Sequence, residues 1–224
     1  QVRGGGVFNF TGGTINVSAD LLITDGTFNM NQNNGTSTLN VTALCNILSA
    51  GASAALNIEA GTATIGSHFT LDGNNKSLNG YVASVTVSGG TLNLNGAAYF
   101  NRAEADLTPF NISGGTVTIA GVVQDNTTGK IQFNVSSTGS LIFQNNVTFE
   151  AGDELNMTGG TVTFQGGNRT FTNAGIVNCT GGTVVFNDAT ATILTGAGTW
   201  NFNNITINSG RTLTSFQKRR GCRS

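Results

Sequence analysis

Apolar and polar residues alternate in short runs along this chain, and one run recurs over most of its length. The run is apolar, Asn, apolar, Ser or Thr, Gly-Gly-Thr, apolar, Thr or Asn, apolar, and its clearest copies are residues 8–17, 110–119, 155–164 and 177–186. Strict alternation is typical of a half-buried strand. Two glycines between the halves permit a turn with positive φ. Each copy therefore predicts two short strands joined by a glycine turn.

The turns recur with a period of 21 to 29 residues, at Gly13, Gly35, Gly61, Gly90, Gly115, Gly139, Gly160, Gly182 and Gly210. Such a period indicates a solenoid, a propeller or an array. A unit of this length is too short for the four strands of a propeller blade, and helical spacers are absent. We therefore predict an all-β fold, a single right-handed parallel β-helix (β-solenoid) of about nine coils over residues 1–214, followed by a basic tail over residues 215–224.

Stacked coils place equivalent residues above one another, so inward Val, Ile, Leu and Phe form one core. The repeat places six asparagines at one register, at Asn9, Asn57, Asn111, Asn134, Asn156 and Asn178. Alternation predicts that they point outward and form ladders, with a buried polar ladder at the turn as the alternative. Cys45 and Cys179 lie in apolar stretches and are expected to be buried. Insertions near residues 70–83 and 99–109 are expected to loop out.

Composition supports this fold and excludes several others. Of 224 residues, 32 are Gly, 33 Thr and 29 Asn, and only 9% are charged. The poor helix propensity of these types argues against a helical domain, and the patterned apolar residues argue against disorder. No basic face is visible before the tail, so we expect no nucleic-acid partner. No apolar run is long enough for a membrane-spanning helix. Because the chain begins with Gln1, we expect a processed form or a fragment.

The Gly-Gly-Thr-apolar-Thr/Asn-apolar rhythm over residues 7–214 resembles the parallel β-helix of bacterial secreted proteins. Similar families are autotransporter passenger domains, filamentous haemagglutinin-like adhesins and the repeat-rich surface proteins of Bacteroidetes-type bacteria, in which phrases like residues 200–210 are common. The resemblance implies a bacterial, extracellular or cell-surface protein. Such proteins serve as adhesins, surface layers, fibres and occasionally enzymes, so the resemblance implies a structural role, as an adhesin or as a subunit of a fibre. The scarcity of charged residues argues against an enzyme.

Candidate catalytic chemistry is sparse. Hydrolysis of a glycosidic bond needs two carboxylates, and close acids in sequence occur only at Glu104/Asp106 and at Glu150, Asp153 and Glu154. Both sets fall at turns or insertions, where acids keep loops soluble. His68 has no second His or Cys nearby, so we expect no metal, cofactor or catalytic residue. A carbohydrate-active β-helix enzyme, a polysaccharide lyase or glycoside hydrolase, remains the alternative, with Glu104, Asp106 and Asp125 as the acids to test.

Paired threonines suggest a third function. Thr-x-Thr recurs at Thr36/Thr38, Thr62/Thr64, Thr116/Thr118, Thr161/Thr163, Thr190/Thr192 and Thr212/Thr214. Outward Thr pairs on stacked coils make a flat array of the kind used by ice-binding solenoids. Residues 92–94 and 141–143 are apolar or Asn, and we expect them to interrupt the array.

Two kinds of surface are candidates for binding. The insertions around residues 74–81 and 99–106 are expected to contact surface glycans or proteins, through Asn74, Asn75, Tyr81, Tyr99 and Phe100. The repeat has no capping helix at either end, so copies of the chain are expected to stack end to end. The basic residues Lys218, Arg219, Arg220 and Arg223 would then cross between copies, and Cys222 is the candidate for a disulfide between two chains.

Overall fold

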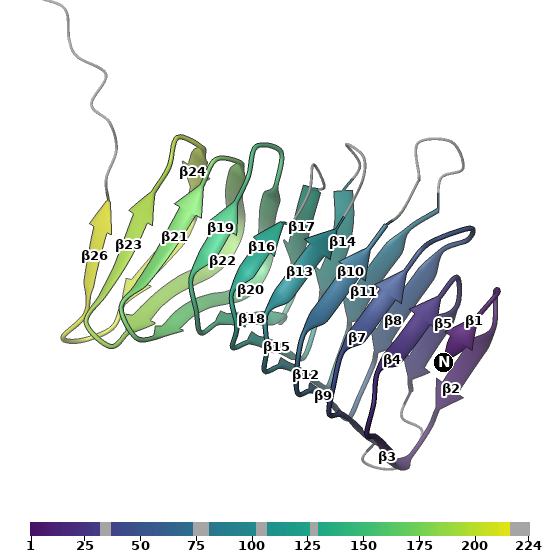
Figure 1. The fold of residues 1–224 in the computed structure, drawn as a ribbon. Helices are drawn as coiled ribbons and strands as arrows, with labels where there is room; N and C mark the ends of the chain where they lie inside the picture. The colour runs from purple at the N-terminus through teal and green to yellow at the C-terminus, as the bar shows by residue number, and fades with distance from the viewer. Residues whose placement is uncertain (32–36, 74–80, 102–106, 126–129, 216–224) are drawn as a thin grey trace, which may run out of the picture.

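The computed structural model describes residues 1–31, 37–73, 81–101, 107–125 and 130–215, and every regular element in these ranges is a β-strand. The strands coil into an elongated rod, with β1 near one end and β26 at the other (Figure 1). The predicted all-β solenoid is confirmed. Within the described ranges, no helix is long and apolar enough to cross a membrane.

Each coil contributes one strand to each of three faces. Face 1 is a sheet of ten strands: β1 (Val2–Arg3), β4 (Leu21–Thr24), β7 (Cys45–Leu48), β10 (Phe69–Asp72), β13 (Ala98–Asn101), β16 (Val123–Asp125), β19 (Val147–Phe149), β21 (Arg169–Asn173), β23 (Ala191–Thr195) and β26 (Thr212–Ser215). Face 2 follows in each coil: β2 (Val7–Phe10), β5 (Thr27–Met30), β8 (Ala54–Ile58), β11 (Ala83–Val87), β14 (Leu107–Ile112), β17 (Lys130–Val135), the first halves of β20 (Glu154–Gly166) and β22 (Ile176–Asp188), and β24 (Thr199–Asn201).

Face 3 completes the coil: β3 (Gly13–Val17), β6 (Ser37–Val41), β9 (Thr62–Ile65), β12 (Thr91–Leu94), β15 (Thr116–Ile119), β18 (Ser140–Phe143), the second halves of β20 and β22, and β25 (Asn204–Ile207). Paired residues lie 20 apart where Val7 meets Thr27 and 29 apart where Phe69 meets Ala98. The predicted period is therefore confirmed, with eight to nine turns in a rod of roughly 40 Å at the usual strand spacing.

The core is one continuous column of inward side chains that changes character along the rod. Toward the N-terminus it is mainly aliphatic, whereas from Phe69 onward it is rich in phenylalanine. Phe133 lies at the centre of this aromatic stack, with ring centroids 5.5 to 6.2 Å from those of Phe100, Phe110, Phe143 and Phe149. Aromatic pairs at such distances add to the free energy of burial.

Both cysteines described by the structure are part of this core, as predicted. Cys45 and Cys179 are buried and unpaired. Burial raises the pKa of the Cys45 thiol to about 12 and that of Cys179 to about 11. Both thiols therefore remain protonated and behave as small apolar side chains.

Glycine is required at the turns between faces 2 and 3 for two reasons. Gly90 has a φ of 67°, which L-residues with a side chain rarely adopt. A Cβ atom on Gly90 would lie 2.6 Å from the carbonyl oxygen of Gly61 in the preceding coil. The turn at Gly139 differs, because the positive φ there, 52°, belongs to Ser137. Gly35 lies outside the described residues.

The predicted asparagine ladder is present and faces outward. On face 2, Asn29 Nδ2 donates to Asn9 Oδ1 at 2.8 Å, and Asn57 Nδ2 donates to Asn29 Oδ1 at 2.9 Å. The same contact joins Asn134 to Asn111 at 2.8 Å and Asn201 to Asn178 at 3.0 Å. The register places Thr86 in this column. The alternative of a buried ladder is wrong, because these amides lie on the partly exposed face of their strands.

Candidate functional site

Face 3 carries an unbroken column of hydroxyl groups on its outer side. The column consists of Thr14, Thr38, Thr62, Thr91, Thr116, Ser140, Thr161 and Thr183. The expected interruption at residues 92–94 and 141–143 is absent from this column, because Leu92, Leu94, Leu141 and Phe143 point into the core. The interruption falls in the neighbouring outward column, where Asn93 and Ile142 stand among the threonines, so the array of Thr pairs is broken as predicted.

The described acids serve mainly to hold the coils together. Asp25 Oδ1 accepts hydrogen bonds from the backbone N–H groups of Ala50, Gly51 and Ala52 in the next coil, at 2.7 to 2.8 Å. Asp153 is buried and accepts from the N–H groups of Ile131 and Glu150, at 2.8 and 2.7 Å.

Glu154 lies on the outer, partly exposed side of face 2 and has polar neighbours. Its Oε2 accepts hydrogen bonds from Gln132 Nε2 and Asn156 Nδ2, both at 2.9 Å. This links the carboxylate to the asparagine ladder. Glu104 and Asp106 lie outside the described residues, and of Asp125 only the backbone in β16 is described. The enzyme alternative thus remains a prediction.

The aromatic residues predicted to contact a partner have different environments. Phe100 is only 1% exposed and stacks within the core, so its prediction as a contact residue is wrong. Alternation along β13 turns Phe100 inward and Tyr99 outward. The Tyr99 ring stacks on that of the exposed His68 with a centroid distance of 5.4 Å. Tyr81 is 36% exposed.

The two predicted insertions fall in connections between face 1 and face 2 strands, along one edge of the rod. The chain passes from face 1 to face 2 between β10 and β11, between β13 and β14, and between β16 and β17, in three successive coils. Tyr81 precedes β11 at this edge, and Tyr99 belongs to β13. Asn74, Asn75, the residues after Ser215 and therefore Cys222 lie outside the described residues.

The N-terminal end exposes residues of core columns. Phe8 occupies the column that continues through Phe28, yet it is 43% exposed. Ile15 and Val17 continue into the columns of Leu39 and Val41 and are only partly buried. These side chains point inward but have no coil over them among the described residues.

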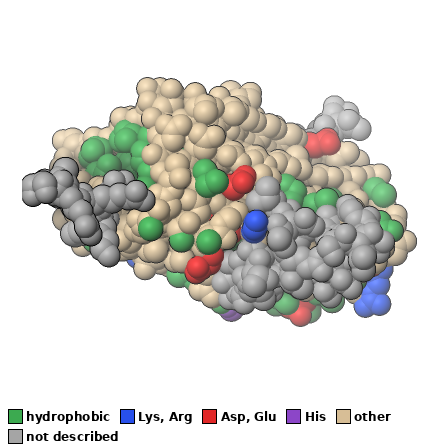
Figure 2. Space-filling view, turned by 90° about the horizontal axis from the view of Figure 1, so that it is seen from above, with side chains coloured by type: hydrophobic (Ala, Val, Ile, Leu, Met, Phe, Trp, Pro, Cys, Tyr) green, Lys and Arg blue, Asp and Glu red, His purple; other side chains and the backbone are tan. Residues whose placement is uncertain are grey.

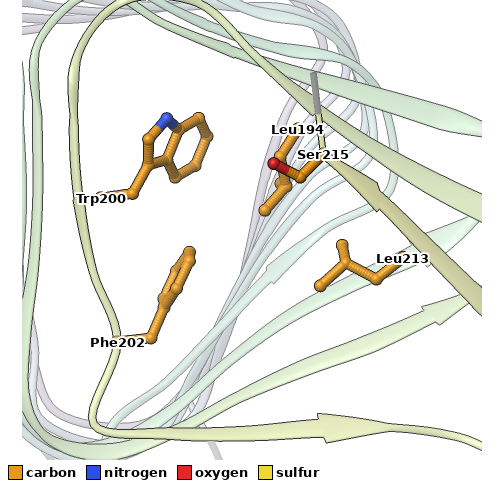
Figure 3. A pocket seen from close by; sticks show the side chains of 5 residues that line it. All are labelled: Leu194, Trp200, Phe202, Leu213 and Ser215. Atoms are coloured by element: carbon orange, nitrogen blue, oxygen red, sulfur yellow. The ribbon is translucent and has the colours of Figure 1, made fainter. Parts of the chain in front are cut away.

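The C-terminal end is apolar in the same way. Ile205 and Ile207 follow Val184 and Phe186 in two core columns and are 45% and 47% exposed. Beside them a cavity of about 270 Å³ is lined by Leu194, Trp200, Phe202, Leu213 and Ser215 (Figure 3). In Figure 2 hydrophobic side chains gather toward this end, while most of the visible surface is uncharged.

Sequence reasoning predicted uncapped ends but not the residues that form them. The signal lies in the first and last copies of the repeat, where Phe8, Trp200, Ile205 and Ile207 stand at positions that are inward elsewhere. Within the described ranges, no group of three or more His, Cys, Asp or Glu side chains is placed to hold a metal ion. Comparison with protein-family models, curated proteins and solved structures finds no match to this chain.

Proposed function

We propose that this chain is an extracellular structural β-solenoid, either an adhesin at a bacterial cell surface or a subunit of a surface fibre, in which copies stack end to end. The observation that carries the proposal is the exposure of core columns at both described ends, at Phe8 on one and at Ile205 and Ile207 on the other. Exposed apolar surface of this kind marks interaction sites.

The kind of partner follows from the fold. Each end is a rim of edge strands with unpaired backbone groups, which is a template for another strand. A second copy offers a matching rim at its opposite end. Because the two contacting ends differ, the contact is head-to-tail and does not close, and contacts of this type produce filaments.

The sides of the rod are suited to adhesion. They carry asparagine and threonine in regular columns, with few charges among the described residues. Tyr81 lies at the edge between faces 1 and 2, whereas the Tyr99–His68 stack lies at the start of the face 1 strands, beside the turn from face 3. Both are proposed contact surfaces for glycans or proteins. Loops on a rigid scaffold are the usual place for binding residues.

Sedimentation velocity of matched lysine variants tests the stacking. Ile205→Lys places a charge in the proposed contact, whereas Ile176→Lys places one on an outward side chain of face 2 that is similarly exposed, at 41%. The unchanged chain and Ile176→Lys are expected to form concentration-dependent multimers, and Ile205→Lys to sediment as a monomer. Multimers that persist equally in both variants contradict stacking through this end.

The hydroxyl column on face 3 favours ice binding as a second candidate function. Eight successive coils present Thr or Ser at one register, from Thr14 to Thr183. Measurement of thermal hysteresis tests this function. Ice binding predicts a hysteresis that Thr116→Lys, at the middle of the column, abolishes, and a chain without hysteresis contradicts it.

A further inference from the structure

The asparagine ladder of face 2 is broken at one coil in the middle of the rod. There β11, which lies between β8 and β14, carries Thr86 in the ladder column (Figure 1). In every other described coil the column holds an asparagine: Asn9, Asn29, Asn57, Asn111, Asn134, Asn156, Asn178 and Asn201. A departure from an otherwise regular pattern marks a position where a function or strain is expected.

The break leaves an acceptor and a donor on opposite sides of Thr86. Asn57 Nδ2 donates to Asn29 at 2.9 Å, so the Oδ1 atom of Asn57 is the group that would accept from the next coil. Asn111 Oδ1 accepts from Asn134 at 2.8 Å, so the Nδ2 group of Asn111 would donate to the preceding coil. Among the described residues, no hydrogen bond joins Thr86 to either asparagine. A threonine hydroxyl is one bond closer to the backbone than an asparagine amide.

The neighbouring outward column of face 2 does not satisfy these groups. Elsewhere it does, as where Asn156 donates to Glu154 Oε2 at 2.9 Å. Beside the break, the equivalent positions two residues before each asparagine are Ala55 and Pro109. Their side chains have no hydrogen-bonding group. The acceptor and the donor on either side of Thr86 are therefore available to a ligand.

The width of the break matches a vicinal diol. One ladder bond and one further strand spacing separate Asn57 Oδ1 from Asn111 Nδ2 by roughly 7–8 Å. Hydrogen bonds of ordinary length at each side leave about 2–3 Å between two ligand atoms. The oxygens of a vicinal diol have this separation, and one donates to the carbonyl while the other accepts from the amide. The partly exposed Thr86 hydroxyl lies between them and can bond to either.

We propose that the break in the ladder binds a neutral sugar, whose vicinal hydroxyls supply the missing step. This site rests on the proposed adhesive function and names its ligand class. A diol reproduces the hydrogen bonds of the two water molecules that it displaces, so binding releases both at little enthalpic cost. Glu59 follows Asn57 by two residues at an exposed position, and its negative charge disfavours acidic sugars.

Tyr81 extends the site toward the edge between faces 1 and 2. It is exposed and precedes β11 by two residues, five residues before Thr86. A chain of this length spans at most about 17 Å, which a short oligosaccharide covers. A tyrosine offers both an apolar ring face and a polar hydroxyl. Oligosaccharides are therefore expected to bind more tightly than single sugars.

Saturation-transfer NMR with neutral tetrasaccharides of glucose, mannose and galactose tests the site, and tetragalacturonate is the acidic probe. The signals observed are those of the sugar, so assembly of the chain does not interfere. At least one neutral probe is expected to bind. Thr86→Asn completes the ladder and should weaken this binding at least tenfold without lowering the urea midpoint. Thr86→Val removes only the hydroxyl and should weaken it several-fold.

Thr118→Asn is the matched control, because it makes the same substitution beside Asn93 on face 3 and should leave sugar binding unchanged. Binding that persists equally in Thr86→Asn overturns the site in the ladder, and its loss in Tyr81→Ala would then leave the adhesive edge intact. Preference for tetragalacturonate overturns the neutral class. A chain that binds none of the neutral probes overturns the sugar site, while sedimentation of the Ile205→Lys variant decides separately whether the fibre function stands.

Discussion

Two aspartates at different positions in the coil have pKa values shifted in opposite directions. Burial acts to raise the pKa of Asp25, but the N–H groups of Ala52, Gly51 and Ala50 outweigh it and hold the pKa below its usual value. Burial also acts on Asp188, which is 1% exposed, and here it prevails and raises the pKa. The Thr192 hydroxyl, which donates at 2.5 Å, and the positive charge of Arg169 oppose that rise only in part.

Replacement of Asp188 by Asn removes a buried charge and keeps the shape. The pKa of Asp188 is higher in the folded than in the unfolded protein. The protonated carboxyl group therefore contributes fully to folding stability below its unfolded pKa near 3.8, and this contribution is lost as pH rises through the folded pKa. Asp188→Asn is therefore expected to raise the urea midpoint at pH 7 more than at pH 4. An equal shift at both pH values contradicts this cause.

Glycine substitutions separate the strained turns from ordinary ones. Gly90→Ala forces a side chain into a left-handed conformation and against the carbonyl of Gly61, and we expect a loss of at least about 1–2 kcal/mol. Gly12→Ala is the control, since a Cβ there meets nothing within 4 Å. Urea unfolding measures both. Similar losses in the two variants would show that the stacked turn is not the cause.

At the scale of elements, the strands are held by columns that run through several coils. Phe133 contacts aromatic rings from β13, β14, β18 and β19, so one side chain joins all three faces. The face 2 asparagines link neighbouring coils on the outside. The inner and outer columns therefore stabilise the same stacking of coils.

Truncation of the central aromatic ring is expected to destabilise the rod strongly. Phe133→Ala leaves a cavity in a fully buried site and should cost about 3–5 kcal/mol of unfolding free energy. Phe8→Ala, at the exposed N-terminal end of the same core column, should cost clearly less in dilute, monomeric protein. Denaturant unfolding followed by fluorescence of Trp200 checks both. Equal losses would argue against a core concentrated in the middle of the rod.

Alternation predicted much of this arrangement from sequence. It correctly turned Asn9, Asn111 and Asn156 outward, because each stands between two apolar residues. The prediction that Phe100 contacts a partner together with Tyr99 is wrong, because adjacent residues of a strand point to opposite sides and Phe100 is inward. The expected interruption of the threonine pairs is confirmed, because Asn93 and Ile142 occupy the second outward column of face 3.

The site at the ends was harder to predict. Which core residues stay exposed depends on where β1 and β26 fall within a coil, and this offset follows from the register of every coil between them. Coil lengths vary from 20 to 29 residues, so the repeat period alone does not fix it. The pairing of Ser215 with Leu194, and of Val2 with Ile23, is visible only in the folded chain.

The whole molecule is a rod with polar sides and apolar ends. The sides carry uncharged ladders of asparagine, whereas Phe8, Ile205 and Ile207 expose surface that would be core in any other coil. In the proposed assembly, association through the ends extends the rod along its axis, and we expect growth in one dimension.

Electron microscopy of the purified chain tests this claim most directly. We expect unbranched filaments of the width of one rod that lengthen with protein concentration and dissolve into short particles in Ile205→Lys. Particles that keep the roughly 40 Å length of one rod at every concentration would contradict end-to-end assembly.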